Sequence, residues 1–257
     1  MLERGLAVID IVTRASGPLS LTAIADAAHL DPSSALRILK TLARAEYVVR
    51  APATKMYLPG PRALVPLSLF HPLAVLRREA AGTIDALQRS LDLAVALVLF
   101  VGSFRLVLEQ RHGGNRLTPF YETIIRSPLH LSATGKQLLL TMTFDERSAI
   151  LDDEPLAPPV TGAPITRDDV ETDLSVSLER GYTVAQDETF AGLSSVAAPV
   201  GAQNARPIGC IGAFGQSSHL KGNAMSLAGR SVMDAAHFLG RMCPAVKDVG
   251  QLLGTPR

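Results

Sequence analysis

The dipeptide Asp31-Pro32 marks the start of a helix more clearly than any other signal in this chain. Aspartate can accept hydrogen bonds from the free N–H groups of a first helical turn, and proline is tolerated at the first helical position. We therefore expect a helix that runs to about Arg44. At about 100° per residue, one side of this helix is apolar. The opposite side is basic and hydroxylic, and it consists of Ser33, Ser34, Arg37, Lys40, Thr41 and Arg44.

This polar side suits the major groove of double-stranded DNA. Arginine offers paired donors to guanine or phosphate, and hydroxyls near a helix N-terminus reach phosphates or base edges. The alternative is an amphipathic helix whose charged side faces water. The neighbouring segments favour DNA binding, because they predict two helices before this one and a β-hairpin after it. The helices are expected at residues 3–14 and 21–28, and the strands of the hairpin at residues 47–50 and 55–58.

The hairpin predicts a wing beside the DNA-binding helix. Arg50 and Lys55 flank its tip, where they can contact the DNA backbone or the minor groove. The charge distribution agrees, because residues 1–62 contain eight Lys and Arg and five Asp and Glu, a net charge of +3, while the remainder carries −2. So small an excess is by itself weak evidence for a polyanionic partner.

The chain shows no signal for export or membrane insertion. Its first residues are charged where a secretory signal would be apolar. No apolar run approaches the ~20 residues needed to cross a bilayer. We therefore expect a soluble, cytoplasmic protein that does not bind membranes.

The sequence after residue 72 mixes helical and strand patterns, which predicts an α+β domain with an antiparallel-rich sheet. Apolar residues at helical spacing are interspersed with short β-rich runs. A segment of about 180 residues is long enough for a core of its own. We expect helices at residues 73–90, 132–142, 144–151, 168–181 and 223–242, and strands at residues 93–101, 104–111, 182–186, 195–200 and 207–214.

Motifs for catalysis are weak in this domain. Residues 192–196, Gly-Leu-Ser-Ser-Val, begin like a nucleophile elbow, but a strand follows Ser194 where that motif needs a helix. The glycines of residues 209–215 have the wrong spacing for a dinucleotide-binding loop and indicate close packing of strands. We therefore expect no enzymatic activity.

Signals for a metal or a cofactor are equally weak. The acidic residues 152–154 and 168–169 border loops and a helix start, where carboxylates act as solvated charges or as caps. Cys210 and Cys243 belong to no cluster of metal ligands. We expect two buried thiols, no metal site and no cofactor.

Several motifs, taken in their order, resemble the isocitrate lyase regulator (IclR) family of bacterial transcription factors. Within the first 62 residues these motifs are LERGLAVI, GPLSLTAIA, DPSSALRILKTL, YVVR and KMYLPGPR. In the rest of the chain they are RSPLHLSATGK at 126–136, ERGYTV at 179–184 and DETFAGLSSVAAPV at 187–200. The similarity covers nearly all of the first module and most of the second.

The resemblance implies a winged helix-turn-helix joined by a linker helix to a GAF-like effector-binding domain. The recognition helix would then carry Ser33, Ser34, Arg37 and Lys40, and the protein would form dimers or tetramers as the family does. The domain boundaries that we expect are residues 1–62 for the DNA-binding module, 63–72 for the linker, 73–245 for the effector-binding domain and 246–257 for a C-terminal tail.

Two residues in the DNA-binding module and linker depart from the family pattern. Ala35 replaces a bulkier residue, which leaves the preferred DNA sequence open. Pro66 interrupts the segment in which the family has its linker helix, so we expect that helix to be kinked or short.

The segment from Ser132 to Gly135 lies at an expected helix start, where unpaired N–H groups and the helix dipole attract an anion. A carboxylate effector is therefore expected there. The alternative is that its serine and the nearby loop serines act only as caps and loop hydroxyls. By resemblance to the family, the pocket would be lined by Ala133, Thr134, Gly135, Leu193, Ser194 and Ser195, with Gly212 and Phe214 on its floor.

Three residues near this pocket depart from the family pattern. Ala185 and Gln186 occupy positions where many relatives carry acidic residues, and Phe214 stands where a small polar residue is frequent. We expect a more apolar pocket, which favours an aromatic or hydrophobic acid over a two- or three-carbon acid.

Together these features predict a sequence-specific transcription regulator controlled by a small organic acid. Because one recognition helix reads too few base pairs, we expect a homodimer or homotetramer on a palindromic operator. The alternative is a small-molecule-binding domain or hydrolase-like enzyme whose N-terminal helical module mediates protein contacts. The sequence does not identify the effector, the target genes or the direction of regulation.

Overall fold

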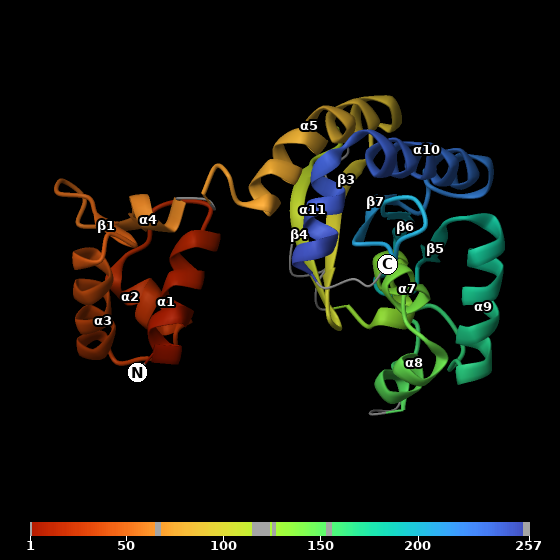
Figure 1. Cartoon of the computed structure of the whole chain (residues 1–257). Coiled ribbons are helices and arrows are strands. Elements are labelled where there is room, and N and C mark those ends of the chain that lie inside the picture. Colours follow the sequence, from red (N-terminus) through yellow and green to blue (C-terminus); the bar gives the residue numbers. More distant parts are fainter. Residues whose placement is uncertain (1, 65–67, 115–123, 125–126, 153–155, 254–257) are drawn as a thin grey trace. The chain divides into compact units, whose positions relative to one another are not determined.

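The computed structural model describes residues 2–64, 68–114, 124, 127–152 and 156–253. The chain divides into two compact units, Met1–Leu67 and Ser68–Arg257 (Figure 1). Pro66, where we expect a kink or an early helix end, lies outside the described residues. None of the helices in the described part of the chain combines the length and apolar character that crossing a membrane requires.

The first unit contains three helices followed by a hairpin and a short helix. These helices are α1 (Leu2–Arg14), α2 (Leu21–Ala27), α3 (Pro32–Arg44) and, after the hairpin, α4 (Pro61–Leu64). Asp31 caps α3 by accepting a hydrogen bond from the Ser34 N–H at 2.9 Å, which confirms the expected helix start. The apolar sides of the helices meet the hairpin in a small core of Val8, Val12, Ile24, Leu39, Val48 and Tyr57.

The hairpin consists of β1 (Val48–Arg50) and β2 (Tyr57–Pro59), which pair antiparallel. The second strand begins two residues later than we expected. Lys55 has a positive φ of 60° and donates its N–H to the Ala51 carbonyl at 2.9 Å, so it belongs to the turn rather than to the strand. The tip of the hairpin is therefore a closed turn that presents Lys55 to solvent.

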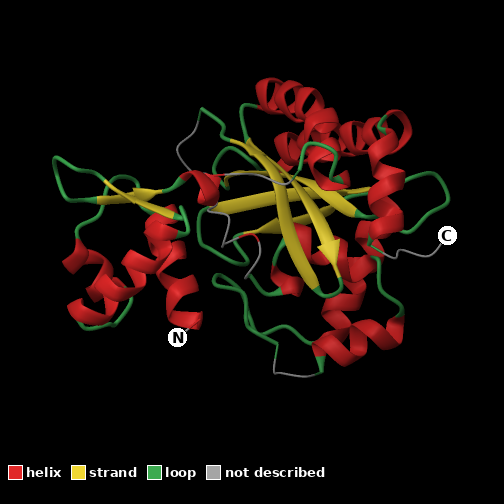
Figure 2. Ribbon diagram, turned by 60° about the vertical axis from the view of Figure 1, so that its left-hand side comes forward, coloured by secondary structure: helices red, strands yellow, loops and turns green. Residues whose placement is uncertain are grey.

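The second unit is built on a five-stranded antiparallel sheet in the order β4-β3-β7-β6-β5. Helices lie on both faces of this sheet (Figure 2), which gives the mixed α+β architecture expected from the sequence. The strands are β3 (Ala94–Val101), β4 (Phe104–Arg111), β5 (Thr183–Gln186), β6 (Leu193–Val200) and β7 (Gly209–Gln216).

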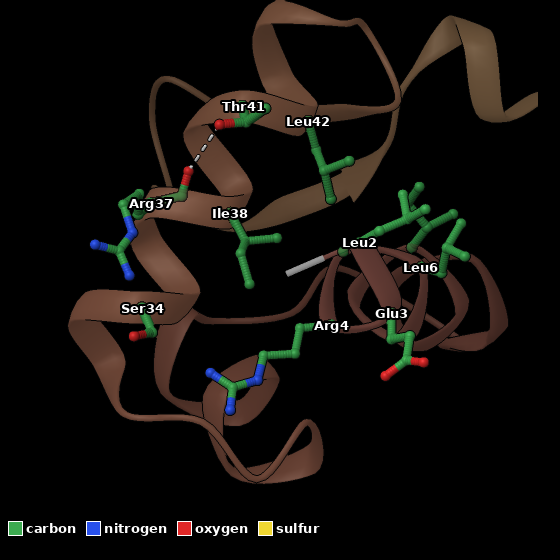
Figure 3. A pocket seen from close by; sticks show the side chains of 11 residues that line it. Leu2, Glu3, Arg4, Leu6, Ser34, Arg37, Ile38, Thr41 and Leu42 are labelled. Atoms are coloured by element: carbon green, nitrogen blue, oxygen red, sulfur yellow. Dashed lines mark hydrogen bonds between the residues drawn. The ribbon is translucent and has the colours of Figure 1, made fainter.

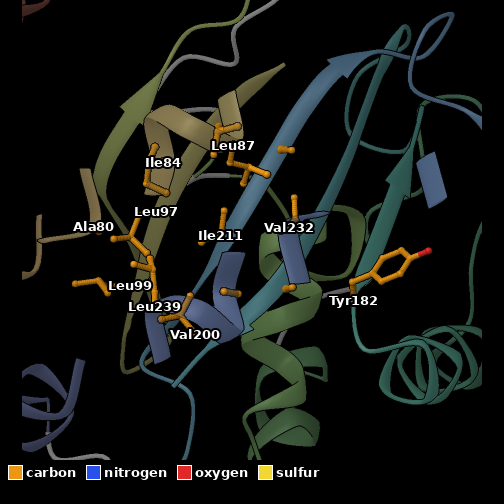
Figure 4. Packing of buried hydrophobic residues seen from close by; sticks show 14 of the residues in the cluster. Ala80, Ile84, Leu87, Leu97, Leu99, Tyr182, Val200, Ile211, Val232 and Leu239 are labelled. Carbon is orange, nitrogen blue, oxygen red and sulfur yellow. The ribbon is translucent and has the colours of Figure 1, made fainter. Parts of the chain in front are cut away.

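One face of the sheet is covered by α5 (Pro72–Leu91), α10 (Gly222–Met242) and α11 (Pro244–Leu252). The sequence of strand β3 is continuously apolar because both faces of the strand are buried and successive side chains alternate between these faces. Large aliphatic side chains such as Leu97, Leu99 and Ile211 point toward these helices (Figure 4). Close packing of the strands, expected from the glycines of residues 209–215, is seen at Gly209, where a Cβ atom would lie 2.1 Å from the Val98 oxygen.

The other face is covered mainly by α7 (Ala133–Leu140) and α9 (Arg167–Arg180), with η1 (Leu129–Leu131) before α7 and α8 (Phe144–Leu151) after it. The sheet residues that point this way are mostly small, and they include Ala94, Ala96, Ala185, Ala197 and Cys210. Small side chains let α7 lie close to the strands, so that its first turn approaches β6 and β7.

We expected residues 246–257 to form a C-terminal tail, and this prediction is wrong for the residues after 245 that the structure describes. Residues 244–252 form helix α11, in which Val246 and Val249 are buried in the core beside α5 and α10. We expected the last helix to end at residue 242, but Pro244, two residues later, begins a new helix, because proline is tolerated at the first helical position. The last residues, 254–257, lie outside the described part of the chain.

The acidic residues act locally, as expected. Asp169 completes a capping box with Thr166 at the start of α9, and Asp152 forms an ion pair of 2.6 Å with Arg167. Asp153 and Glu154 lie outside the described residues. Within the described ranges, no group of three or more His, Cys, Asp or Glu side chains is placed to hold a metal. Both cysteines are buried free thiols, as expected.

The burial of α11 leads to a test of folding stability. Val249 is completely buried, so we expect Val249→Ala to lower the free energy of unfolding by about 2 kcal/mol. Leu252 lies on the same helix but is 51% exposed, and Leu252→Ala should change stability by less than about 0.5 kcal/mol. Denaturant unfolding followed by circular dichroism measures both, and equal effects would contradict the placement of α11.

Candidate nucleic-acid interface and ligand cavity

Helix α3 presents to solvent the side chains that the sequence placed on its polar side. Ser33, Arg37, Lys40, Thr41 and Arg44 are exposed, and Ser34 is partly exposed. The opposite side is apolar, with Ala35 and Leu39 completely buried. The expected division of this helix into a packed side and a cationic side is therefore present in the structure.

The cations on α3 are available to a partner. Among the described residues, no carboxylate forms an ion pair with Arg37, Lys40 or Arg44. The nearest acid in sequence, Asp31, is occupied by capping: hydrogen bonds from Ser33 and Ser34 hold the pKa of its carboxyl well below the usual value. The outer face of α3 thus combines positive charge with hydroxyl groups, which is the combination that phosphates and base edges require.

The hairpin adds two exposed cations. Arg50 donates from Nε to the Lys55 carbonyl at 3.3 Å, and its guanidinium lies 5.8 Å from the centre of the Tyr57 ring. These contacts hold the Arg50 side chain along the hairpin. Lys55 stands at the closed turn with its side chain exposed.

A groove of about 790 Å³ separates α1 from α3 within the first unit. Figure 3 shows Ile38 and Leu42 directed toward α1, whereas Arg37 points away from it. Leu2 and Leu6 line the α1 side of the groove. The groove is mainly apolar, and Ser34, Arg37 and Thr41 of the polar side of α3 lie along its edge.

The second unit contains a small cavity at the start of α7. Its volume is about 20 Å³, which is room for about one water molecule. Four of the residues nominated for an effector site line it, namely Thr134, Leu193, Ser195 and Phe214. The complete lining is Ile124, Ser127, Ser132, Thr134, Thr189, Leu193, Ser195 and Phe214.

The other nominated residues do not line the cavity. Ser194 faces the opposite side of β6 from Ser195 and donates a hydrogen bond of 2.9 Å to Ser217, which in turn donates to Asp187. The Ala133 carbonyl accepts a hydrogen bond from Thr183. Gly135 packs against the Leu129 backbone and Gly212 against the Phe214 ring, so both serve close packing.

Two hydroxyl groups in the cavity wall can form further hydrogen bonds. Ser195 is only 6% exposed, and its hydroxyl has no hydrogen-bond partner among the described residues. The Thr134 hydroxyl accepts from Arg105 Nη1 at 3.1 Å, and its own proton has no acceptor in the described part of the chain. Hydroxyls that line a small cavity are normally hydrogen-bonded, so a ligand or a water in the cavity would complete them.

Arg105 is a residue of this site that sequence reasoning missed. It is 5% exposed, and its Nη1 lies 2.7 Å from the Ser132 hydroxyl. Burial lowers the pKa of Arg105 to about 10, so the guanidinium stays positive at neutral pH. The alternating pattern of β4 puts Phe104 and Leu106 on one face, which predicts that Phe104 is buried and Arg105 exposed. In the structure Phe104 is 75% exposed, and Arg105 is buried.

Helix α7 is held in place by a buried lysine. The Lys136 ammonium lies 2.8 Å from Asp173 on α9, 2.8 Å from Glu188 and 2.9 Å from the Val184 carbonyl on β5. Burial raises the pKa of Glu188, and the neighbouring Lys136 opposes that rise. The loop after β5 is also tied to η1, because the Thr189 hydroxyl donates to the Leu131 carbonyl at 2.7 Å.

Comparison with known protein families matches both units. The family described as "Bacterial transcriptional regulator IclR C-terminal" matches residues 73–240, and the family described as "IclR helix-turn-helix domain" matches residues 1–52. These matches include most of the chain, and they include both α3 and the cavity.

Individual relatives and solved structures agree. The regulator BhcR from Paracoccus denitrificans is 26% identical, over 97% of this chain and 89% of the relative, and the repressor AllR from Escherichia coli K12 is 26% identical, over 91% and 87%. The Thermotoga maritima IclR structure has a TM-score of 0.70 at 20% identity, covering 98% of both chains. An IclR homologue from Microbacterium hydrocarbonoxydans, complexed with 4-hydroxybenzoate, has a TM-score of 0.73 at 18% identity, covering 97% of this chain and 99% of the homologue. This chain therefore belongs to the IclR family of bacterial transcriptional regulators.

Proposed function

We propose that this chain is a cytoplasmic, sequence-specific DNA-binding regulator that acts as a homodimer or homotetramer and responds to a small organic acid. The observation that carries the DNA-binding part is the exposed face of α3, where Arg37, Lys40 and Arg44 stand without carboxylate partners among the described residues. Helix α3 would enter the major groove, and Arg50 and Lys55 of the hairpin would contact the adjacent backbone or minor groove. One such helix reads too few base pairs for a genome, so two copies on a palindromic operator supply the specificity.

The cavity at α7 supports control by an acid. The Thr134 and Ser195 hydroxyls can donate to a carboxylate, the first turn of α7 offers backbone N–H groups, and the Arg105 charge lies behind this wall. The 4-hydroxybenzoate complex of the Microbacterium homologue supports an organic acid as the kind of ligand. Binding would control DNA affinity only if the acid interacts differently with the DNA-competent and DNA-incompetent states.

We propose no catalytic activity for this site. Ser194, the one residue that suggested a nucleophile, is completely buried within strand β6 and engaged with Ser217. A nucleophile elbow would instead present its serine at a sharp turn before a helix. The relatives compared above are named as regulators or repressors, which agrees with this proposal.

The role of α3 is tested by Arg37→Ala. Losing one arginine contact to guanine or phosphate should weaken operator binding by about 1–3 kcal/mol, while leaving the affinity for an acid unchanged. Fluorescence anisotropy with labelled DNA from upstream of the protein's own gene, at a fixed salt concentration, measures the loss.

Arg14→Ala provides the matched control for that experiment. Arg14 lies at the end of α1, outside α3 and the hairpin, and it pairs with Asp10 on its own helix at 3.4 Å. We expect its replacement to change operator affinity by less than about twofold. An Arg37→Ala protein that binds the operator as tightly as the wild type would remove Arg37 from the interface.

The ligand role of Ser195 is tested against its neighbour. Ser195→Ala should leave folding stability equal or slightly higher, because it removes a buried hydroxyl that lacks a partner in the described protein, and should weaken acid binding by about 1 kcal/mol. Ser194→Ala should do the reverse, costing about 1 kcal/mol of stability with no loss of acid affinity.

Thermal unfolding gives the stability of both serine variants. Calorimetric titration gives their affinity for whichever of glyoxylate, pyruvate and benzoate binds the wild type most tightly. Equal effects of the two substitutions on ligand affinity would contradict the orientation of β6 in the site. Failure of every acid to bind the wild type would count against effector control.

A further inference from the structure

Phe214 forms part of the wall of the cavity that we assign to the effector. Its side chain is 6% exposed and lines the cavity from strand β7, opposite Ala94 of β3 and Ser195 of β6. With the ring in place, only about 20 Å³ remains, which is room for about one water molecule. Little open space is therefore left beside the ring at the start of α7.

The sheet is shaped to receive this ring. Gly212 lies two residues before Phe214 on the same face of β7. A Cβ atom at Gly212 would lie 2.9 Å from Cζ of Phe214 and 3.1 Å from the Thr134 methyl group. The tip of the ring thus lies over Gly212 and beside the first turn of α7, and the missing side chain at position 212 makes room for it.

We infer that Phe214 determines the size of the effector, because its ring occupies the space in which the body of a larger ligand would lie. The inference rests on the proposed function, since it concerns the same cavity. Ala185, Gln186 and Phe214 led us to expect an aromatic or hydrophobic acid, but the remaining volume points to a short acid.

The volumes explain the direction of this preference. An apolar cavity that takes up benzene has a volume of roughly 150 Å³. This volume is several times that of the cavity beside Phe214. Protein interiors are close-packed, so a benzoate-type acid must displace the Phe214 ring from its place over Gly212. A three-carbon acid such as pyruvate can place its carboxylate at the Thr134 and Ser195 hydroxyls with a much smaller displacement.

The test compares benzoate and pyruvate binding to the full-length wild type and Phe214→Ala by calorimetric titration. Removing the ring should increase benzoate affinity by at least about tenfold. Pyruvate affinity should change much less, because its carboxylate contacts remain. Phe214→Leu is the second variant, which keeps apolar packing if the alanine variant does not fold, and it should show a smaller gain for benzoate.

Phe100→Ala is the matched control. Phe100 is also 6% exposed and belongs to the same hydrophobic cluster on the neighbouring strand β3, but it does not line the cavity. Its replacement should lower the melting temperature by an amount similar to that of Phe214→Ala and leave benzoate affinity at the wild-type value. A gain for benzoate in Phe100→Ala would mean that loosened packing, rather than the place of Phe214, admits the ring.

Outcomes for Phe214 and for the proposed function can be separated. Wild-type protein that binds benzoate as tightly as folded Phe214→Ala and Phe214→Leu overturns the inference, whatever the DNA result. Phe214→Ala could gain benzoate binding while benzoate leaves its operator affinity unchanged. That result supports the size limit and counts against effector control. Operator binding that persists while no variant binds either acid overturns the inference and leaves DNA binding in place.

Discussion

The ligand-binding unit depends on the position of α7, and that position depends on the buried ammonium of Lys136. A lysine charge away from water is unfavourable unless it is paired, and here Asp173, Glu188 and the Val184 carbonyl supply its partners. These partners come from α9, from β5 and from the loop after it, so one side chain joins α7 to consecutive elements that lie far from it in the sequence. Because Ser132 and Thr134 lie within the turn before Lys136, the same contacts place the polar wall of the cavity.

The DNA-binding half could be predicted in detail because its signals are local. A cap, a proline and a helical period were enough to place α3 and to separate its apolar residues from Arg37 and Lys40. The hairpin was predicted with a small error at Lys55, whose positive φ depends on how the turn closes rather than on strand propensity. Nothing in this half required knowledge of distant partners.

The cavity could be predicted only in part, because its residues are brought together by strand register. Resemblance to a family pointed to the right segments, but it did not separate Ser194 from Ser195, which lie on opposite faces of β6. The burial of Arg105 could not be predicted, because the apolar Phe104 next to it would be expected to face the core and is instead exposed. The burial of Val249 likewise depends on helices far away in sequence, so a short segment after Pro244 could be read as a tail.

The two faces of the sheet carry side chains of very different size, with leucine, isoleucine and valine toward α5, α10 and α11 and mainly alanine, cysteine and serine toward α7. The larger core lies on the side away from the cavity. Exchanging a residue on the α7 side can therefore alter which compound is admitted without repacking that core. On the proposed function, relatives with the same sheet would differ in the acids that they bind through residues on the α7 side, while the aliphatic core on the other side stays the same.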